Sequence, residues 1–484
     1  MGIIAKNNKK NQSINQNLRD SYVILQAKFV KRQGEYMKFT KMSLVAALLI
    51  GSSAFAIDNV KVSGDAKLYY TTDDAKANGA APVTGLTASD SLFNAGSSAG
   101  QAALGLGITA DLTKNISAGV HTTVLTTLGL QQQLVNNVWE GTAGTSDSWI
   151  VDEAWIAATV GNTTGKIGRM KLDTPLVFSE TWSIVENTFE AAVVINQDIP
   201  DTTLVGAYVG GSNAYSAVNG NATGNPTLGV NAGIANRIQA QNASNTTFSQ
   251  FYNGAYAAGI VNNTIKPVTV QAWYYDAPQY VDAIWLQADA DVEGIMVGAQ
   301  YTKINYNRSA NLGIAADSDN DAYAFKLGYE MKDVAAISVA YSQTGTETTS
   351  MPNPLGAYLG AGQNLATLGN GAQSKLYTEA WWNYGYVTRV DTQAWNVTVT
   401  GKAAGIDLGA YYTQTNQDNN NNTIVGQDMK EFTVTAGKDF GPLNATVAYI
   451  YTKADDLNID PTSTNPNAKG DAFNTIQAYL TVNF

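Results

Sequence analysis

The chain of 484 residues contains no cysteine and a single histidine, His121. Without cysteine, neither a disulfide framework nor a thiolate metal site can form, and one histidine leaves little scope for imidazole chemistry. No Ser-His-acid arrangement is legible around His121, so we do not expect an enzyme. Acidic residues number 40 against 29 basic residues, which argues against a nucleic-acid partner.

Long apolar runs are also scarce. The mean hydropathy is -0.14, and apart from residues 42–50 no long apolar stretch occurs, which excludes a bundle of membrane-spanning helices. What the chain does contain is 44 glycines, 25 tyrosines and only 14% charged residues. This composition favours a protein built from many half-apolar strands.

Residues 37–56 have the pattern of a secretory signal peptide. Lys38 and Lys41 form a charged start, residues 42–50 are apolar, and residues 54–56 read Ala-Phe-Ala, a small-x-small cleavage site. The segment is too short and wrongly flanked for a stop-transfer helix. We therefore expect export through the Sec pathway with cleavage after Ala56.

Residues 1–36, which precede this signal, are polar and rich in Lys and Asn. Because Met37 is a natural start position, we interpret them as an extension from a misplaced start; a long charged region of the signal is the alternative. Nine of the 29 basic and two of the 40 acidic residues lie before residue 57. The mature chain, residues 57–484, would then hold 20 basic and 38 acidic residues, a formal net charge of -18.

The last residues alternate between apolar and polar side chains and end on Phe484. Period two is typical of a strand with one face toward lipid and one toward water. A terminal aromatic strand is similar to the signal by which the outer-membrane assembly machinery recognises its barrels, and an ordinary amphipathic edge strand is the alternative. We predict that Phe484 carries this assembly signal.

The same alternation opens the mature chain, where Lys61, Asp65 and Lys67 share one face. Charged side chains need water, so we expect this face to line a lumen. His121 lies on the polar face of a later predicted strand and is expected to face the lumen as well.

Period and turn signals predict eighteen strands, with sixteen as the fallback. An even number places both termini of a bacterial barrel on the same side and leaves no open edge in hydrocarbon. The predicted strands cover residues 59–71, 101–112, 116–127, 149–160, 165–171, 188–197, 202–210, 251–262, 266–276, 281–291, 294–305, 321–331, 334–344, 392–401, 405–414, 429–437, 443–453 and 471–484.

The connections between these strands alternate between short turns and mostly long segments rich in Gly, Asn, Ser and Thr. Short periplasmic turns and long external loops are typical of outer-membrane barrels. The long segment 345–391 contains several aromatic residues between 377 and 386, which either stack solutes at a pore mouth or, the interpretation we favour, pack the loop or rest at the lipid interface.

A transmembrane antiparallel barrel of about eighteen strands encloses a lumen wide enough for water and small solutes. The first predicted strand begins just after the cleavage site, which argues against a separate N-terminal plug domain. A channel of this width needs a constriction to set a size limit. A surface barrel with structural or adhesive loops and a closed lumen is the alternative.

A candidate constriction follows the fifth predicted strand. The stretch Gly168-Arg169-Met170-Lys171-Leu172-Asp173-Thr174-Pro175-Leu176, with Glu186-Asn187-Thr188-Phe189-Glu190-Ala191 after it, resembles the OprD-like outer-membrane porins, especially the epsilonproteobacterial type related in role to the Campylobacter major outer membrane porin. The motif covers only about residues 165–210. The resemblance implies an eighteen-stranded barrel with an inward-folded third external loop, and a homotrimer.

Carried onto this chain, the resemblance implies an inward loop over residues 172–187. Asp173, Glu180 and Glu186 would present carboxylates to the constriction, and Arg169 and Lys171 would form an opposing basic side. Crossed charges at a constriction orient permeating dipoles and set ion selectivity.

Members of this family that are specific for basic amino acids have an arginine ladder along the wall. The mature chain has only four arginines, Arg169, Arg237, Arg308 and Arg389, so it cannot build a continuous ladder. We therefore expect a general channel for ions and small hydrophilic solutes with weak cation preference, and a substrate-specific porin is the alternative. The acidic excess supports this sign weakly, since carboxylates of external loops that hold divalent ions at lipopolysaccharide would also explain it.

Three carboxylates, Asp317, Asp319 and Asp321, have the spacing that opens a calcium loop. Ala322 stands where an EF-hand has glycine, and Gly328 where it has glutamate, so this is not an EF-hand. A solvated acidic loop is the interpretation we favour, with loose Ca²⁺ or Mg²⁺ binding as the alternative. We expect no resident cofactor.

Overall fold

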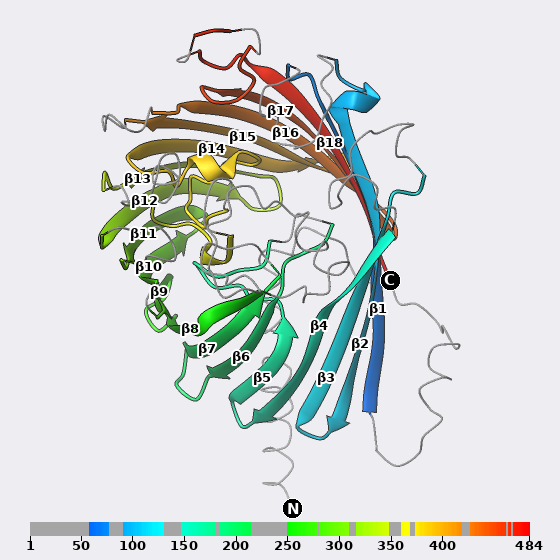
Figure 1. Cartoon of the computed structure of the whole chain (residues 1–484). Coiled ribbons are helices and arrows are strands. Elements are labelled where there is room, and N and C mark those ends of the chain that lie inside the picture. Colours follow the sequence, from blue (N-terminus) through cyan, green and yellow to red (C-terminus); the bar gives the residue numbers. More distant parts are fainter. Residues whose placement is uncertain are drawn as a thin grey trace, which may run out of the picture.

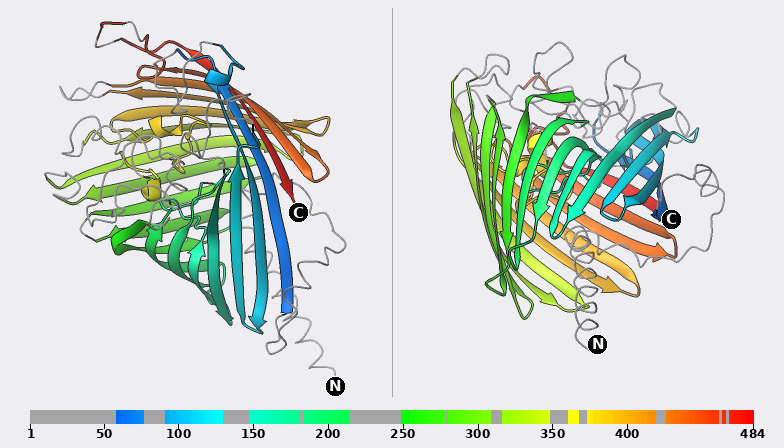
Figure 2. Two further views of the ribbon diagram at one scale, coloured as in Figure 1. Left: turned by 45° about the vertical axis from the view of Figure 1, so that its right-hand side comes forward. Right: turned by 90° about the horizontal axis from the view of Figure 1, so that it is seen from below.

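Eighteen antiparallel strands form one closed barrel in the computed structural model of the chain (Figures 1 and 2). The structure describes residues 58–76, 91–129, 147–180, 184–213, 249–278, 280–308, 316–347, 360–367, 373–418, 426–460, 463–465 and 468–484. The predicted signal peptide and the extension before it lie outside these ranges. Among the described residues, no helix is long and apolar enough to cross a bilayer.

The strands are β1 (Asp58–Asp73), β2 (Ser98–Thr113), β3 (Ile116–Thr126), β4 (Asp147–Val160), β5 (Thr163–Met170), β6 (Phe189–Asn196), β7 (Thr202–Ser212), β8 (Ser249–Asn262), β9 (Val268–Ala277), β10 (Val281–Val292), β11 (Ile295–Tyr306), β12 (Ser318–Met331), β13 (Ala335–Thr344), β14 (Thr392–Ala403), β15 (Ile406–Gln417), β16 (Met429–Phe440), β17 (Leu443–Ala454) and β18 (Phe473–Asn483). Every predicted strand end lies within three residues of the observed one. The count of eighteen is confirmed, and the fallback of sixteen is wrong.

The barrel closes where β1 pairs with β18. At this seam the backbone of Phe484 exchanges two hydrogen bonds with Gly64, of 2.7 and 2.9 Å. A side chain at Gly64 would collide with the Phe484 ring, whose nearest carbon would lie 2.5 Å from an added Cβ. The terminal aromatic ring therefore packs on a glycine of the first strand, and no strand edge stays open at this point.

Successive side chains along each strand point alternately to the outer, apolar face of the barrel and to its inner face. On β3, for example, Val120 and Val124 are 52% and 41% exposed on the outer side, while His121 and Thr123 lie on the inner side. Toward the extracellular ends, outward aromatic side chains from successive strands contact one another, as in Tyr323, Tyr341 and Trp395. These rings form part of an interfacial aromatic girdle.

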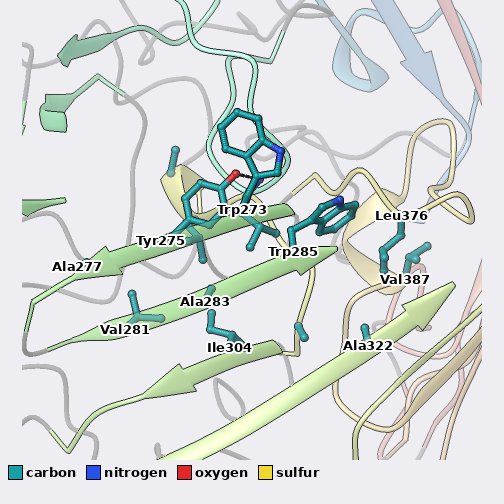
Figure 3. Packing of buried hydrophobic residues seen from close by; sticks show 14 of the residues in the cluster. Trp273, Tyr275, Ala277, Val281, Ala283, Trp285, Ile304, Ala322, Leu376 and Val387 are labelled. Carbon is teal, nitrogen blue, oxygen red and sulfur yellow. Dashed lines mark hydrogen bonds between the residues drawn. The ribbon is translucent and has the colours of Figure 1, made fainter. Parts of the chain in front are cut away.

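The hydrophobic core lies inside the barrel. Its largest cluster joins the inner faces of β9–β12, with contributions from β6, β7, β14, β16 and β17, to the described parts of two connections that fold inward. We name them the β5–β6 loop (described residues 171–180 and 184–188) and the β13–β14 loop (described residues 345–347, 360–367 and 373–391). Figure 3 shows Trp273 and Tyr275 of β9 and Trp285 of β10 packed near Leu376 and Val387 of the β13–β14 loop. The coloured, described part of this loop, yellow in Figure 1, lies within the ring of strands.

Candidate functional site: the constriction inside the barrel

The β5–β6 loop begins as a tight hairpin over residues 172–179. The amide of Ser179 donates to the carbonyl of Leu172 (2.8 Å), and the amide of Thr174 donates to the carbonyl of Val177 (3.0 Å). At the entrance to this loop, Gly168 has φ +125°, and an added Cβ would lie 2.2 Å from the carbonyl oxygen of Ala154. Only glycine fits this conformation, so the glycine of the Gly-Arg motif has a backbone role.

The tip of the hairpin inserts into the core across the lumen. Leu176 is 1% exposed, and its amide donates to the hydroxyl of Tyr275 on β9 (3.3 Å). The second half of the loop contacts the wall on the other side, where Ile184 and Val185 pack with Tyr69 of β1. The β5–β6 loop therefore crosses the barrel interior and touches two distant parts of the wall.

The β13–β14 loop supports this hairpin from the other side. The amide of Leu365 donates to the carbonyl of Leu176 (2.7 Å), and the side-chain amide of Asn364 donates to the carbonyl of Phe178 (2.9 Å). Lys375 forms an ion pair with Asp173. The constriction thus consists of two loops docked on each other.

The β13–β14 loop is itself fixed to the inner wall. The hydroxyl of Tyr377 donates to Asp289 on β10 (2.6 Å), and the amides of Trp382 and Asn383 donate to the carboxylate of Glu431 on β16 (3.0 and 2.7 Å). Trp382 and Tyr386 are buried. These rings pack the loop inside the barrel, whereas a resting place at the lipid interface is excluded for them.

The opposite wall carries a cluster of charges from β1 to β5. We use the name charged wall for the set of residues Asp65, Lys67, His121, Asp152, Glu153, Lys166, Lys171 and Glu186. Glu186, in the β5–β6 loop, forms an ion pair with Lys171 and a second one with Lys67 of β1 (3.4 Å). Burial opposes ionisation of Glu186, but the two ammonium groups outweigh it and hold the pKa of this carboxyl below its ordinary value.

His121 lies at the centre of the charged wall between two carboxylates. Its Nδ1 is 2.7 Å from Asp152, and its Nε2 is 3.7 Å from Asp65 on β1. β2 lies between β1 and β3, and Gly105 on β2 leaves the space over which Asp65 and His121 approach each other. An added Cβ there would lie 2.5 Å from the carboxylate of Asp65 and 2.9 Å from the imidazole.

A β-bulge in β4 explains why two adjacent acids belong to the same cluster. The pairing of β3 with β4 shifts between His121 and Thr122, so that Asp152 has no partner in the register. A bulge re-aims side chains in this way. Asp152 accepts hydrogen bonds inside the wall, including one from Thr123 (2.8 Å), while Glu153 lies 3.9 Å from Lys171.

The register places the predicted lumen-facing residues Lys61, Asp65, Lys67 and His121 on the inner face. Three of them converge in the charged wall, and Lys61 lies nearer the periplasmic end of β1. The role of Phe484 as an assembly signal stays a prediction, since its position at the seam does not test it.

Arg169 lies elsewhere than predicted. On β5, Ile167 is 63% exposed on the outer face and Met170 is buried in the core, so Arg169 has outward parity. Its guanidinium lies 3.0 Å from Glu190 of β6, which also has outward parity, and donates to the carbonyl of Val151 (3.1 Å). The expectation that Arg169 forms a basic side of the constriction is therefore wrong, because the strand register turns it away from the lumen.

The remaining predicted constriction residues do not face each other across the pore as crossed charges. Lys171 pairs directly with Glu186. Asp173 has a side chain that is 55% exposed and pairs with Lys375, a residue that the sequence analysis did not select. Glu180 is 5% exposed, and its amide donates to Asn187 (2.7 Å), so it is a buried part of the loop.

The three aspartates 317, 319 and 321 do not converge. Asp317 accepts from the amide of Arg308 (2.6 Å), Asp319 pairs with Lys303 (2.5 Å), and Asp321 follows on β12. Within the described ranges, no group of three or more His, Cys, Asp or Glu side chains is arranged to hold a metal ion. Loose Ca²⁺ or Mg²⁺ binding stays an untested expectation.

Several residues of the site are not among those predicted from the sequence. Asp152, Glu153 and Lys166 join the charged wall, and Lys326 lies near Asp289 (3.7 Å) on the opposite side. The inward parity of their strands was a usable signal for Glu153, Lys166 and Lys326, whereas Asp152 joins the charged wall only through the bulge in β4. No comparable signal marks the inward course of the β13–β14 loop, because its docking depends on contacts between segments far apart in sequence.

A sequence profile described as Gram-negative porin matches residues 43–368, two thirds of the chain. The chain is a member of this porin family. The family and the closed barrel make it an outer-membrane channel for small solutes. A search of curated proteins finds no match.

Solved porin structures share the fold of this porin. OccK8 (OprE) of Pseudomonas aeruginosa aligns over 89% of this chain and 99% of its own, with TM-score 0.61 and 14% identity. The outer membrane protein opdK of P. aeruginosa aligns over 89% and 100%, with TM-score 0.61 and 13% identity. A BenF-like porin from Pseudomonas fluorescens Pf-5 aligns over 88% and 99%, with TM-score 0.61 and 10% identity. The predicted OprD-like architecture is confirmed at the level of fold.

Proposed function

We propose that this porin is a passive diffusion channel for ions and small hydrophilic solutes, with weak cation preference. The observation that carries the proposal is the β5–β6 loop, which crosses the lumen and contacts β1, β9 and the β13–β14 loop. A loop held at two walls narrows a wide barrel without sealing it, because the charged wall beside it needs water.

Weak selectivity is supported by the balance of the charged wall. It contains four carboxylates, three lysines and His121, and most of its charges are paired with each other. Paired charges of both signs produce only a small net electrostatic potential in the pore. The acidic excess of the whole chain then determines whether cations or anions are weakly preferred. A strongly selective binding site would require unpaired charges of one sign.

Reconstitution in a planar bilayer tests the channel itself. We expect stepwise conductance from the folded protein and a reversal potential of the cation-selective sign across a KCl gradient. A folded protein without conductance steps would support the surface barrel with a closed lumen. Saturation of the current by one solute class would support the substrate-specific alternative.

The proposal also covers how the channel is exported, assembled in the membrane and bound to its partners. We include export by the cleaved signal peptide, recognition of Phe484 by the barrel assembly machinery, and a homotrimer. Contact with lipopolysaccharide through divalent ions is supported by four carboxylates of outward parity near the extracellular ends of β9–β12, namely Asp276, Asp282, Asp319 and Asp321. Chelation of divalent ions is expected to release lipopolysaccharide from the purified protein, as measured by gel staining.

A further inference from the structure

Two glycines of β2 allow the side chains of β1 and β3 to meet on the inner face of the barrel. Gly107 pairs in register with His121 of β3, and Gly105 pairs with Asp65 of β1. An added Cβ at Gly107 would lie 3.1 Å from the Cδ2 carbon of His121, and one at Gly105 would lie 2.9 Å from its Nε2 nitrogen. The imidazole therefore lies over β2 and reaches toward Asp65 on the strand beyond it.

Asp152, on the other side of the imidazole, is a buried carboxylate that is held in place by several donors. It is 4% exposed. The hydroxyl of Thr123 and the amide of Glu153 donate to it (2.8 and 3.1 Å), and Nδ1 of His121 lies 2.7 Å away. Among the described residues, His121 is the one basic side chain within 4 Å of this carboxylate. An ionised carboxylate at such a buried place needs a counter-charge, because burial removes the water that would otherwise stabilise it.

The two carboxylates beside His121 indicate its protonation state. An ionised carboxylate only accepts hydrogen bonds, whereas a neutral imidazole has one nitrogen that donates and one that accepts. A neutral ring would therefore turn a nitrogen lone pair toward a carboxylate oxygen, either that of Asp152 at 2.7 Å or that of Asp65 at 3.7 Å. The doubly protonated ring avoids this repulsion, because it presents an N–H group on both sides.

The lysines of the charged wall are too few to balance its carboxylates. Lys67 lies 3.7 Å from Asp65 and 3.4 Å from Glu186. Lys171 contacts the same Glu186 and lies 3.9 Å from Glu153, which also attracts Lys166. Four carboxylates thus face three lysines, and a charged His121 brings the positive and negative groups of the charged wall to equal numbers.

We propose that His121 carries a positive charge throughout the neutral pH range and completes the charge balance of the charged wall, which keeps the ion preference of the pore weak. Its charge cancels that of Asp152, so a permeating cation meets no net negative charge at this wall. The inference rests on the proposed function and deepens it, because it names the residue that limits cation selectivity.

His121 is the only histidine of the chain, which makes its charge directly measurable. The untagged porin is produced with nitrogen-15-labelled histidine, placed in lipid nanodiscs and examined by NMR between about pH 6 and about pH 8, where an unperturbed imidazole loses its proton. We expect both ring nitrogens to give the signals of protonated nitrogens, without change across this range. A signal from an unprotonated ring nitrogen, or a titration within the range, would overturn the proposal.

Reversal potentials across a KCl gradient test the effect of the charge on selectivity. His121→Gln keeps a polar side chain and removes the charge, so we expect the cation-to-anion permeability ratio to rise about twofold to threefold. H121Q/D152N removes one charge of each sign and is the matched control, in which the ratio should stay unchanged. A neutral His121 predicts the opposite pair of results, an unchanged ratio in H121Q and a lower ratio in H121Q/D152N, and either result contradicts the proposal.

The loss of a counter-charge for Asp152 can also prevent H121Q from folding, which heat-modifiable mobility on gels reveals. In that case H121Q/D152N and the NMR signals of the unmodified porin decide. A folded, unmodified porin without conductance steps would overturn the channel function itself. A neutral His121 in a conducting porin would overturn only the inference about this residue.

Discussion

Replacing Glu186 with glutamine removes a carboxylate that contacts both Lys67 and Lys171. Both ammonium groups then face the pore without this counter-charge. An ion that passes about 7 Å away gains or loses about 0.3 kcal/mol after screening in 0.1 M salt. Since cations and anions respond with opposite signs, we expect the cation-to-anion permeability ratio to fall about threefold.

The same substitution weakens the hold of the β5–β6 loop. Breaking a fully buried ion pair costs about 3–5 kcal/mol, but the side chain of Lys171 is 35% exposed and therefore partly screened. We expect a loss of about 1–2 kcal/mol in loop docking, visible as increased open-channel noise.

Reversal potentials across a tenfold KCl gradient measure the change in selectivity. Glu293→Gln is the matched control, because Glu293 lies in the short turn between β10 and β11, away from the charged wall, and its removal should leave selectivity unchanged. Adding Lys171→Met to E186Q should move the ratio back toward that of the unmodified protein. An E186Q channel with the same reversal potential as the unmodified protein would refute the assignment of Glu186 and its lysines to the pore lining.

Three further predictions concern the two inward loops. Gly168→Ala is expected to lower the free energy of unfolding by about 1–3 kcal/mol, since φ at this position is +125° and the added Cβ would collide with the backbone of Ala154. Gly165→Ala is the matched control, because an added Cβ there meets open space and should leave stability unchanged. Urea unfolding, followed by heat-modifiable mobility on gels, compares the stabilities of the two variants. Leu176→Ala should cost about 2–5 kcal/mol of hairpin docking and give larger, noisier conductance steps, and steps of unchanged size would contradict the role of the hairpin as constriction. Burial raises the pKa of Glu379 in the β13–β14 loop to about 8, and the amide of Ser374 and the ammonium of Lys375 offset this effect only in part. The stability of the docked loop therefore falls as the pH rises from about 4.5 to about 8, and it stays constant above pH 8. Gating noise should increase from pH 5 to pH 8.5 and become flat in E379Q, and an equal pH response in E379Q would exclude this carboxyl as the cause.

The strands could be predicted from the sequence because each of them follows the same local pattern of alternating residues. Alternation of apolar and polar residues follows from a wall with lipid outside and water inside, so β1 to β18 could be located to within three residues. The same rule gave the inward positions of Asp65, Lys67 and His121. The predicted role of Arg169 at the constriction rested on the family resemblance and not on this rule, and the alternation of β5 places Arg169 on the outer face beside Glu190.

The pairing of charges inside the lumen was not readable. Whether Lys171 faces Glu186 across a pore or contacts it directly depends on how the loop folds back, which no local pattern specifies. The bulge at Asp152 and the gap above Gly105 depend likewise on which strands become neighbours. The docking of Asn364 on Phe178 joins residues 186 positions apart, a separation at which sequence periodicity carries no information.

This last contact also divides the external surface into two kinds of loop. A connection that only faces the medium can change length and composition freely. The β13–β14 connection cannot, because its inner part holds the hairpin that sets the width of the pore. Substitutions in the inner part of this one external loop are therefore expected to change the permeability of the channel together with the surface that the loop presents to the medium.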